Sequence, residues 1–229
     1  GVGGGNLYIS RQDGSVDVVS NKEGKVVMTL AAKSGSTELL NQPEAVALAN
    51  EIIYVVDSKT EQVVMYDMTT GKYQGSFGSS ANGNLSGDFA LDEPSGIAAH
   101  EGVIYVADTG NERVQMFGIN GVFLDTLVLS APPSSSDKEL PYKLGEPRDV
   151  AVDMEGRIYV RDEDDNSVKV YKPSGEYLRS LPKTGKPVAL SVAEDGIYVM
   201  DEAAFAILKY NFDANLAYSF GSKGEGKAQ

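Results

Sequence analysis

The 229-residue sequence contains no cysteine, no tryptophan and a single histidine, His100. The lack of cysteine excludes disulfide bonds and thiol chemistry, and one histidine is too few for a zinc site built from several histidines. No serine–histidine–aspartate arrangement is visible around His100. No apolar run approaches the roughly 20 residues that a membrane-spanning helix needs. These absences leave the carboxylates as the main candidates for any chemistry.

Positive charge is also scarce, because 20 Lys and Arg residues face 33 Asp and Glu residues, for a formal net charge of −13. The basic residues are scattered and mostly neighbour acidic ones. Such a surface repels phosphate backbones, so we expect no nucleic-acid partner. The lack of cysteine fits an extracytoplasmic bacterial protein, periplasmic or secreted, and this is the location that we expect. No signal peptide is visible, and a chain that starts with Gly1 is expected to be a processed or trimmed piece.

What the sequence does contain is a repeat. Five tyrosines lie inside an [IL]-Y-[VI] run, at Tyr8, Tyr54, Tyr105, Tyr159 and Tyr198. Three residues after the last four of them stands an aspartate, at Asp57, Asp108, Asp162 and Asp201. A proline precedes each of these aspartates by 14 or 15 residues, at Pro43, Pro94, Pro147 and Pro187. A period of this size is typical of solenoids and propellers.

The unit Asp92–Leu127 shows what one repeat contains. It holds four short apolar segments separated by turn residues, among them the hairpin signal Asn120-Gly121. This pattern predicts a four-stranded antiparallel meander. One such sheet has two unburied faces and is not stable alone, so repeated copies predict a β-propeller.

The residues of this unit resemble a known motif. Pro94-Ser95-Gly96-Ile97-Ala98, followed by Asp108 to Val114, is similar to the NHL repeat. The resemblance implies an all-β, NHL-type β-propeller with four-stranded antiparallel blades. Asp149 departs from the motif, since glycine is usual there. The resemblance says little about function, because NHL propellers include RNA binders, protein-binding platforms and a few metal-dependent enzymes.

We expect one propeller domain over residues 1–229, with five readable repeats at approximately 1–30, 43–77, 94–128, 147–181 and 187–220. The first repeat lacks its proline and its first strand, apart from a remnant at Val2. Because most NHL propellers resemble six-bladed rings, the resemblance implies a six-bladed parent protein of which this sequence lacks a part. A closed five-bladed ring is the alternative. Aromatic residues at one place in the third strands should pack between blades; they are Tyr66, Phe117, Tyr171 and Tyr210.

The aspartates of the repeat allow two interpretations. They could form a carboxylate ring for a metal, or each could cap backbone N–H groups of its own turn, and a constant spacing favours capping. The four consecutive acids 162–165 make Asp162 and Asp164 weak candidates for Ca²⁺, but the glycine and glutamate of an EF-hand loop are missing. We therefore expect no metal or other cofactor.

Binding residues are expected on the face that carries the long connections 78–93 and 129–146, because loops on a rigid scaffold commonly carry recognition. The candidates are Glu44, Arg148 and Asp149 just after the strand-opening prolines, and Pro132, Pro133 and Tyr142 in the second connection. The predicted function is a non-catalytic scaffold that binds a protein or peptide through this face. The alternative is a Ca²⁺-dependent hydrolase of the lactonase kind, with its metal in the central channel.

Overall fold

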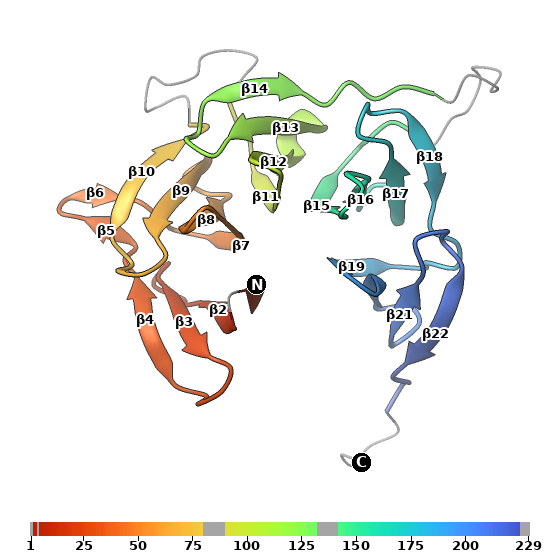
Figure 1. Ribbon diagram of the computed structural model, residues 1–229, viewed down its shortest axis with the longest axis horizontal. Coiled ribbons are helices and arrows are strands. Elements are labelled where there is room, and N and C mark those ends of the chain that lie inside the picture. Colours follow the sequence, from red (N-terminus) through yellow and green to blue (C-terminus); the bar gives the residue numbers. More distant parts are fainter. Residues whose placement is uncertain (1, 4, 80–89, 132–141, 225–229) are drawn as a thin grey trace. The chain divides into compact units, whose positions relative to one another are not determined.

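The structure is a computed structural model that describes residues 2–3, 5–79, 90–131 and 142–224. Its strands form five four-stranded antiparallel sheets in chain order, together with one two-stranded hairpin (Figure 1). In the described residues the only helical element is the 3₁₀ turn η3 (Thr109–Asn111). No helix in this part of the chain is long and apolar enough to cross a membrane. The prediction of an all-β propeller with four-stranded antiparallel blades and five readable repeats is confirmed.

The chain divides into two compact units, residues 1–126 and 127–229. The first unit holds three blades and the hairpin. Blade 1 consists of β1 (Val2–Gly3), β2 (Asn6–Ser10), β3 (Val16–Ser20) and β4 (Val26–Leu30). The hairpin consists of β5 (Lys33–Ser34) and β6 (Thr37–Glu38). Blade 2 consists of β7 (Pro43–Ala49), β8 (Ile52–Asp57), β9 (Gln62–Asp67) and β10 (Tyr73–Phe77). Blade 3 consists of β11 (Pro94–His100), β12 (Val103–Asp108), β13 (Arg113–Gly118) and β14 (Phe123–Thr126).

The second unit holds the last two blades. Blade 4 consists of β15 (Pro147–Val152), β16 (Ile158–Asp162), β17 (Ser167–Tyr171) and β18 (Tyr177–Ser180). Blade 5 consists of β19 (Pro187–Ala193), β20 (Gly196–Asp201), β21 (Ala206–Tyr210) and β22 (Leu216–Phe220). The strands therefore begin and end close to the positions that the repeat predicts. The remnant at Val2 is the two-residue strand β1, which pairs with β2.

The proline and the aspartate of each repeat are partners across the sheet. Pro94 at the start of β11 lies opposite Asp108 at the end of β12, and the register shifts by one residue directly after the proline. Blades 2, 4 and 5 show the same pairing and the same shift. A proline has no N–H to donate to the ladder, so it is suited to the first residue of a strand. The constant spacing in the sequence thus reflects one shared strand register.

Within each unit the apolar core lies between neighbouring blades. In the first unit, Tyr54 and Phe77 of blade 2 belong to one buried cluster with Ile104 and Phe117 of blade 3, and the two phenylalanine rings lie 4.7 Å apart. A second cluster joins blade 1 to blade 2. In the second unit, an equivalent cluster joins blades 4 and 5. Period-2 alternation supplies both faces of each sheet with side chains for this packing.

The inter-blade role is confirmed for three of the third-strand aromatics, which belong to the clusters above: Tyr66, Phe117 and Tyr210. The tyrosines add a polar contact that the sequence did not reveal. Tyr66, Phe117, Tyr171 and Tyr210 are all fully buried. The three tyrosine hydroxyls each donate a hydrogen bond of 2.7 Å to a backbone carbonyl of the connection before a blade, at Ala31, Tyr142 and Pro182. Burial raises the pKa of all three phenols, that of Tyr210 to about 12.

Each fourth strand carries two apolar residues four positions apart, which period-2 alternation alone would place on one face of the sheet. The later member is buried in blades 1 to 4, as in Leu30 and Phe77, but the earlier members Val26 and Tyr73 are 51% and 41% exposed. In blade 4 the earlier member, Tyr177, is 9% exposed, so both members of that pair are buried. In blade 5 Phe220, the later member, is also exposed.

Replacing Phe117 with alanine should destabilise the protein by about 3–5 kcal/mol, because it empties the contact between blades 2 and 3. Urea unfolding measures this change. Val122→Ala is the matched control: Val122 is 57% exposed on the same blade, and its substitution should change the unfolding free energy by no more than about 0.5 kcal/mol. Equal effects of the two substitutions would contradict this description of the core.

Candidate functional site

The repeated aspartates are fully buried and take up backbone N–H groups from two segments. Asp57 Oδ2 accepts from the amides of Asn41 and Gln42, at 2.7 Å each, in the connection before blade 2. Its Oδ1 accepts from the amide and the hydroxyl of Thr60 in its own turn, at 2.8 and 2.9 Å. The turn contacts agree with the capping interpretation. The contacts to the connection were not expected, and they tie each blade to the segment that enters it.

The other aspartates repeat this contact. Asp108 accepts from the amide of Asp92 at 2.7 Å. Asp162 accepts from Gly145 and Glu146 at 3.0 and 2.8 Å, and Asp201 accepts from Gly185 and Lys186 at 2.7 and 3.1 Å. We call these four residues, Asp57, Asp108, Asp162 and Asp201, the clamp aspartates. They also show that the connection into each blade and the turn after its second strand lie at the same edge of that blade.

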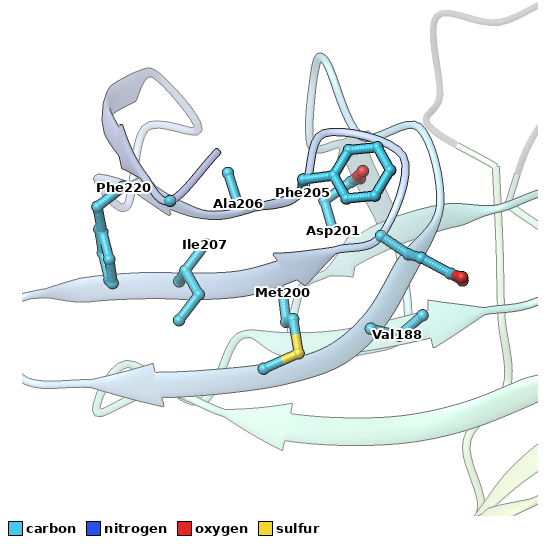
Figure 2. Close-up of a pocket in the computed structure, with 9 residues that line it drawn as sticks. Val188, Met200, Asp201, Phe205, Ala206, Ile207 and Phe220 are labelled. Atoms are coloured by element: carbon cyan, nitrogen blue, oxygen red, sulfur yellow. The ribbon is translucent and has the colours of Figure 1, made fainter. Parts of the chain in front are cut away.

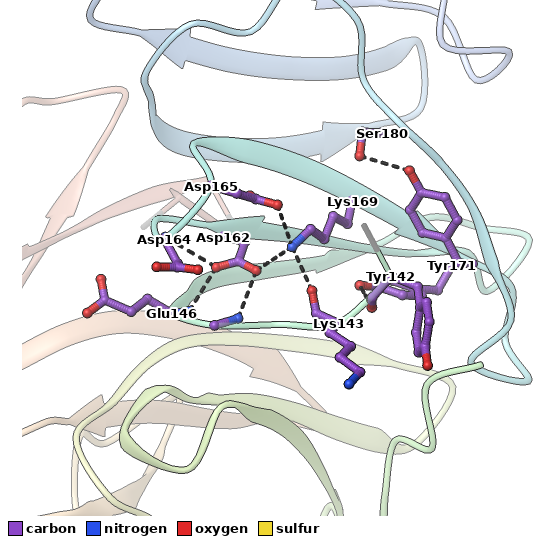
Figure 3. Close-up of polar contacts among 11 residues, drawn as sticks. Tyr142, Lys143, Glu146, Asp162, Asp164, Asp165, Lys169, Tyr171 and Ser180 are labelled. Atoms are coloured by element: carbon purple, nitrogen blue, oxygen red, sulfur yellow. Dashed lines mark hydrogen bonds and ion pairs between the residues drawn. The ribbon is translucent and has the colours of Figure 1, made fainter. Parts of the chain in front are cut away.

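A lysine stands beside the weak calcium candidates in blade 4 (Figure 3). Lys169 Nζ lies 2.6 Å from Asp162 and 2.8 Å from Asp165, and it donates to the carbonyl of Lys143 at 2.6 Å. Burial alone would raise the pKa of Asp162, but the lysine and the two backbone amides outweigh burial and lower it. The ammonium group therefore supplies positive charge at Asp162. In the described residues no group of three or more His, Asp or Glu side chains could hold a metal ion.

The second unusual feature of blade 4 lies on its two inner strands. Asp149 on β15 and Arg161 on β16 are cross-strand partners. The corresponding pairs in the other blades are small or apolar, namely Ala45 with Val56, Gly96 with Ala107, and Ala189 with Met200. A charged pair thus occupies a place that faces the next blade elsewhere in the chain. A charged pair at a position that is small or apolar in the other repeats departs from the hydrophobic pattern, and such departures are expected at functional sites.

The environment of this pair is partly desolvated. Although part of Asp149 reaches the surface, burial raises the pKa of its carboxyl to about 6, against the lowering effects of a 3.1 Å hydrogen bond from the Leu190 amide and of the Arg161 charge. Burial also lowers the pKa of Arg161. The Nε of Arg161 is buried and makes no hydrogen bond within the described part of the chain. The guanidinium remains charged, since arginine is not deprotonated in proteins.

Arg148 lies beside this pair, because it directly precedes Asp149 on β15. Its Nε lies 2.8 Å from a carboxylate oxygen of Glu163, and its side chain is one-third exposed. Glu146 lies further away, at 3.9 Å. Arg148, Asp149, Arg161 and Glu163 therefore form a group of charges at the edge where the connection enters blade 4, and we call it the inner-strand charge cluster.

The remaining predicted residues lie elsewhere or outside the described residues. Glu44 belongs to the first unit, where its carboxylate accepts from Gln42 Nε2 at 2.8 Å and from the Ser58 hydroxyl at 2.9 Å. Tyr142, in the second unit, is held through its carbonyl by Tyr171. Pro132 and Pro133 lie outside the described residues. Of the predicted residues, Arg148 and Asp149 belong to the inner-strand charge cluster, where the fold places Arg161 and Glu163 beside them. The role of all the predicted residues in binding stays a prediction.

Arg161 and Lys169 were not among the predicted residues. Each could have been found by aligning the five repeats column by column. Arg161 occupies the column of Val56, Ala107 and Met200, where a charge is out of place. Lys169 occupies a column of mixed chemistry, with Gln115 in blade 3 and Leu208 in blade 5, so its signal is weaker.

The fold and these contacts define a β-propeller, and comparison with known proteins agrees. The family model described as NHL repeat matches residues 91–117, which cover most of blade 3. This match, in the blade whose residues carry the motif, supports the predicted resemblance to NHL-repeat propellers. Comparison with curated protein sequences finds no match.

Three solved structures share the fold. The first is a chain of the nidogen/laminin complex, with a TM-score of 0.71 and 17% identity over 95% of this chain and 76% of that chain. The second is streptogramin B lyase, with 0.67 and 10% over 96% of this chain and 66% of the lyase. The third is hydrazine synthase of Kuenenia stuttgartiensis, with 0.60 and 18% over 94% of this chain and 56% of that chain. At these identities the likeness concerns the fold alone.

The clamp aspartates should stabilise the fold through the connection as well as through their own turn. Asp57→Ala leaves the N–H groups of Asn41, Gln42 and Thr60 without this acceptor, so the free energy of unfolding should fall by about 2–5 kcal/mol. Asp67 is the control, because among the described residues its carboxylate accepts within the hairpin of β9 and β10, from Thr69, Thr70 and Gln74. Asp67→Ala should cost about 1 kcal/mol. A loss at Asp57 no greater than that at Asp67 would contradict the clamp.

The raised pKa of Asp149 predicts a specific pH dependence. In the unfolded chain this carboxyl ionises near its ordinary value of 3.8, but in the folded protein it keeps its proton until about pH 6. Its contribution to stability therefore falls as the pH rises from about 4 to 6 and is constant above that. Asp149→Asn removes this fall, so its stability relative to the native protein should increase by about 1–3 kcal/mol across this interval. Urea unfolding at a series of pH values measures the difference, and a constant difference would contradict the assignment.

Proposed function

We propose that this chain is a non-catalytic binding propeller that contacts a protein or peptide through the edge where the connections enter the blades. The observation that supports this function is the inner-strand charge cluster of blade 4. Its central pair, Asp149 and Arg161, replaces the small and apolar residues of the other blades. A charged pair in a partly desolvated place is seldom more stabilising than well-packed apolar residues. We therefore attribute the pair to recognition.

The chemistry of the cluster favours a partner that presents a carboxylate. Arg148 is one-third exposed and is oriented by Glu163, so its guanidinium can form a second, bidentate contact. Arg161 adds a charge whose Nε lacks an acceptor among the described residues. An acidic side chain or a chain terminus could pair with the exposed part of Arg148, and the charge of Arg161 would attract it. The overall negative charge of the protein would then select against partners that are acidic over a wide surface.

Other elements of the proposal come from the sequence. The connection 129–146 enters at the same edge, and its described end is fixed through the carbonyls of Tyr142 and Lys143. We propose that it forms part of the contact surface, with Tyr142 as a binding residue. We also propose an extracytoplasmic location on the basis of the cysteine-free composition.

A double variant separates binding from stability. Asp149→Ala with Arg161→Val restores the residues of blade 2 at this place, so the protein should be as stable as the native one or up to about 3 kcal/mol more stable. Partners captured by cross-linking to the native protein should bind this variant at least about tenfold more weakly in titration calorimetry. Glu155→Ala is the control, because Glu155 is an exposed acid on a turn of the same blade. Unchanged affinity of the double variant would remove the cluster from the binding site.

A further inference from the structure

The connection from blade 1 to blade 2 carries a small sheet of its own, the hairpin of β5 and β6 (Figure 1). The residues that follow this hairpin are firmly held. Leu39 and Leu40 are buried, and their amides both donate to the Ala32 carbonyl, at 2.8 and 3.1 Å. The Gln62 side chain on β9 also donates to the Leu39 carbonyl, at 2.9 Å. The base of the hairpin is therefore fixed to blade 2.

The hairpin and the outer strand of blade 2 form a cleft with a volume of about 310 Å³. Thr37 and Glu38 line it from the hairpin, and Tyr73 and Ser76 line it from β10. The buried side chain of Gln62 lines it from β9. All of these residues belong to the first unit, so the cleft does not involve the second one. Its volume is at the lower end of the range for small-molecule sites.

A bulge in β10 turns Tyr73 and Ser76 toward the hairpin. These residues are three positions apart, so in a regular strand they would lie on opposite faces of the sheet. The register shifts by one residue between Tyr73 and Gly75. The cross-strand partners of Tyr73 and Ser76 are then Tyr66 and Val64, which lie two positions apart and share a face. Gly75 has a φ of 151°, which glycine adopts without strain, so the bulge depends on this residue.

Blade 4 has the same two residue types at these positions, but there they contact each other. Tyr177 is 9% exposed, and its hydroxyl lies 3.0 Å from that of Ser180. In blade 2 Tyr73 is 41% exposed. Its ring packs edge-on against the buried Tyr66, with the ring centres 6.4 Å apart. The core therefore holds the Tyr73 ring in place, while part of the ring is exposed at the cleft.

The polar groups of the cleft can both donate and accept hydrogen bonds. The hydroxyls of Thr37 and Ser76 do both, and the carboxylate of Glu38 accepts. In the part of the chain that the structure describes, this carboxylate has no ion pair and no hydrogen bond. None of the described residues that line the cleft is basic, so Glu38 would repel an anion. The cleft thus suits a neutral ligand that carries several hydroxyl groups.

A hollow on blade 5 has the opposite chemistry (Figure 2). Most of the side chains that line it are apolar, among them Met200, Ile207 and Phe220. Such side chains offer no hydrogen bonds to replace those that a polar ligand makes with water. The hollow therefore suits a different class of ligand from the cleft of blade 2.

We propose that the cleft between the β5–β6 hairpin and β10 binds a neutral sugar ring, either as a free monosaccharide or as one unit of a glycan. The C–H groups of the sugar lie on the Tyr73 ring, because they are weakly positive and the face of an aromatic ring is negative. Glu38, Thr37 and Ser76 bind the sugar hydroxyls, which need donors and acceptors together. The inference does not depend on the inner-strand charge cluster, which belongs to the other unit.

NMR titration of the full chain with neutral sugars tests the proposal. The probes are the methyl glycosides of glucose, galactose, mannose, xylose and N-acetylglucosamine, with maltose and cellobiose as disaccharides. At least one should bind with a Kd of about 1 mM, as expected for a ligand this small, and should shift the amide signals of Gly75 and Ser76. Tighter binding of a disaccharide would identify the ligand as part of a glycan, and equal binding would identify a free sugar; either result supports the proposal.

Tyr73→Ala and Glu38→Ala should each weaken this binding at least about tenfold, whereas Tyr73→Phe keeps the ring and should change the affinity by no more than about threefold. Tyr218→Ala and Glu23→Ala are the matched controls, because Tyr218 is 52% exposed on blade 5 and Glu23 is exposed on a turn of blade 1. Both should leave the affinity unchanged. Glu38 is exposed, so Glu38→Ala should unfold in urea like the native protein, and its loss of binding is then not a loss of fold.

Three results would overturn the proposal. The first is that no probe binds. The second is binding that neither Tyr73→Ala nor Glu38→Ala weakens, because the sugar would then lie elsewhere, for example in the hollow of blade 5. The third is binding of lysine methyl ester without binding of any sugar, because the cleft would then take a cation.

Discussion

The contact on which the rest of this structure depends is the hydrogen bond from the backbone of an incoming connection to a buried carboxylate. Asp57 and Asp201 each accept two such amides, from consecutive residues just before the strand-opening proline. A buried carboxylate is costly unless its oxygens are satisfied, and these N–H groups would themselves be orphaned without it. Each clamp fixes where its blade begins, and therefore which side chains reach the next blade.

Two blades strengthen the clamp with a charged partner on the third strand. Arg113 contacts Asp108 at 2.7 Å, and Lys169 contacts Asp162 at 2.6 Å. Blade 2 instead uses Gln62, which donates to the carbonyl of Leu39 in the connection. The third strand thus contacts the clamp aspartate or the connection in each of these blades, through an arginine, a lysine or a glutamine. The partners come from two positions of the third strand, because Gln62 and Arg113 open it and Lys169 lies two residues further on.

The sequence predicted the fold better than the site. Proline, tyrosine and aspartate recur at fixed spacing because strand pairing demands it, so they reveal the register of blades 2 to 5. The sequence predicted only part of the inner-strand charge cluster. Arg148 and Asp149 follow a proline of the repeat and were predicted, but Arg161 lies in a segment that has the pattern of an ordinary strand. Its partner across the sheet is set by the one-residue shift after Pro147, and spacing alone does not show that shift. The exposure of Phe220 depends on what lies against it, which no local pattern encodes.

The hydrogen bonds from the tyrosine hydroxyls to the connections affect how the protein behaves in alkaline solution. Only a neutral phenol can donate to the carbonyls of Ala31, Tyr142 and Pro182. Burial keeps the protons of Tyr66, Tyr171 and Tyr210 in place above the pH at which an ordinary phenol ionises. These three bonds to the connections therefore persist above the pH at which an ordinary phenol ionises. A phenol that becomes exposed to alkaline solution loses its proton and can no longer donate the bond.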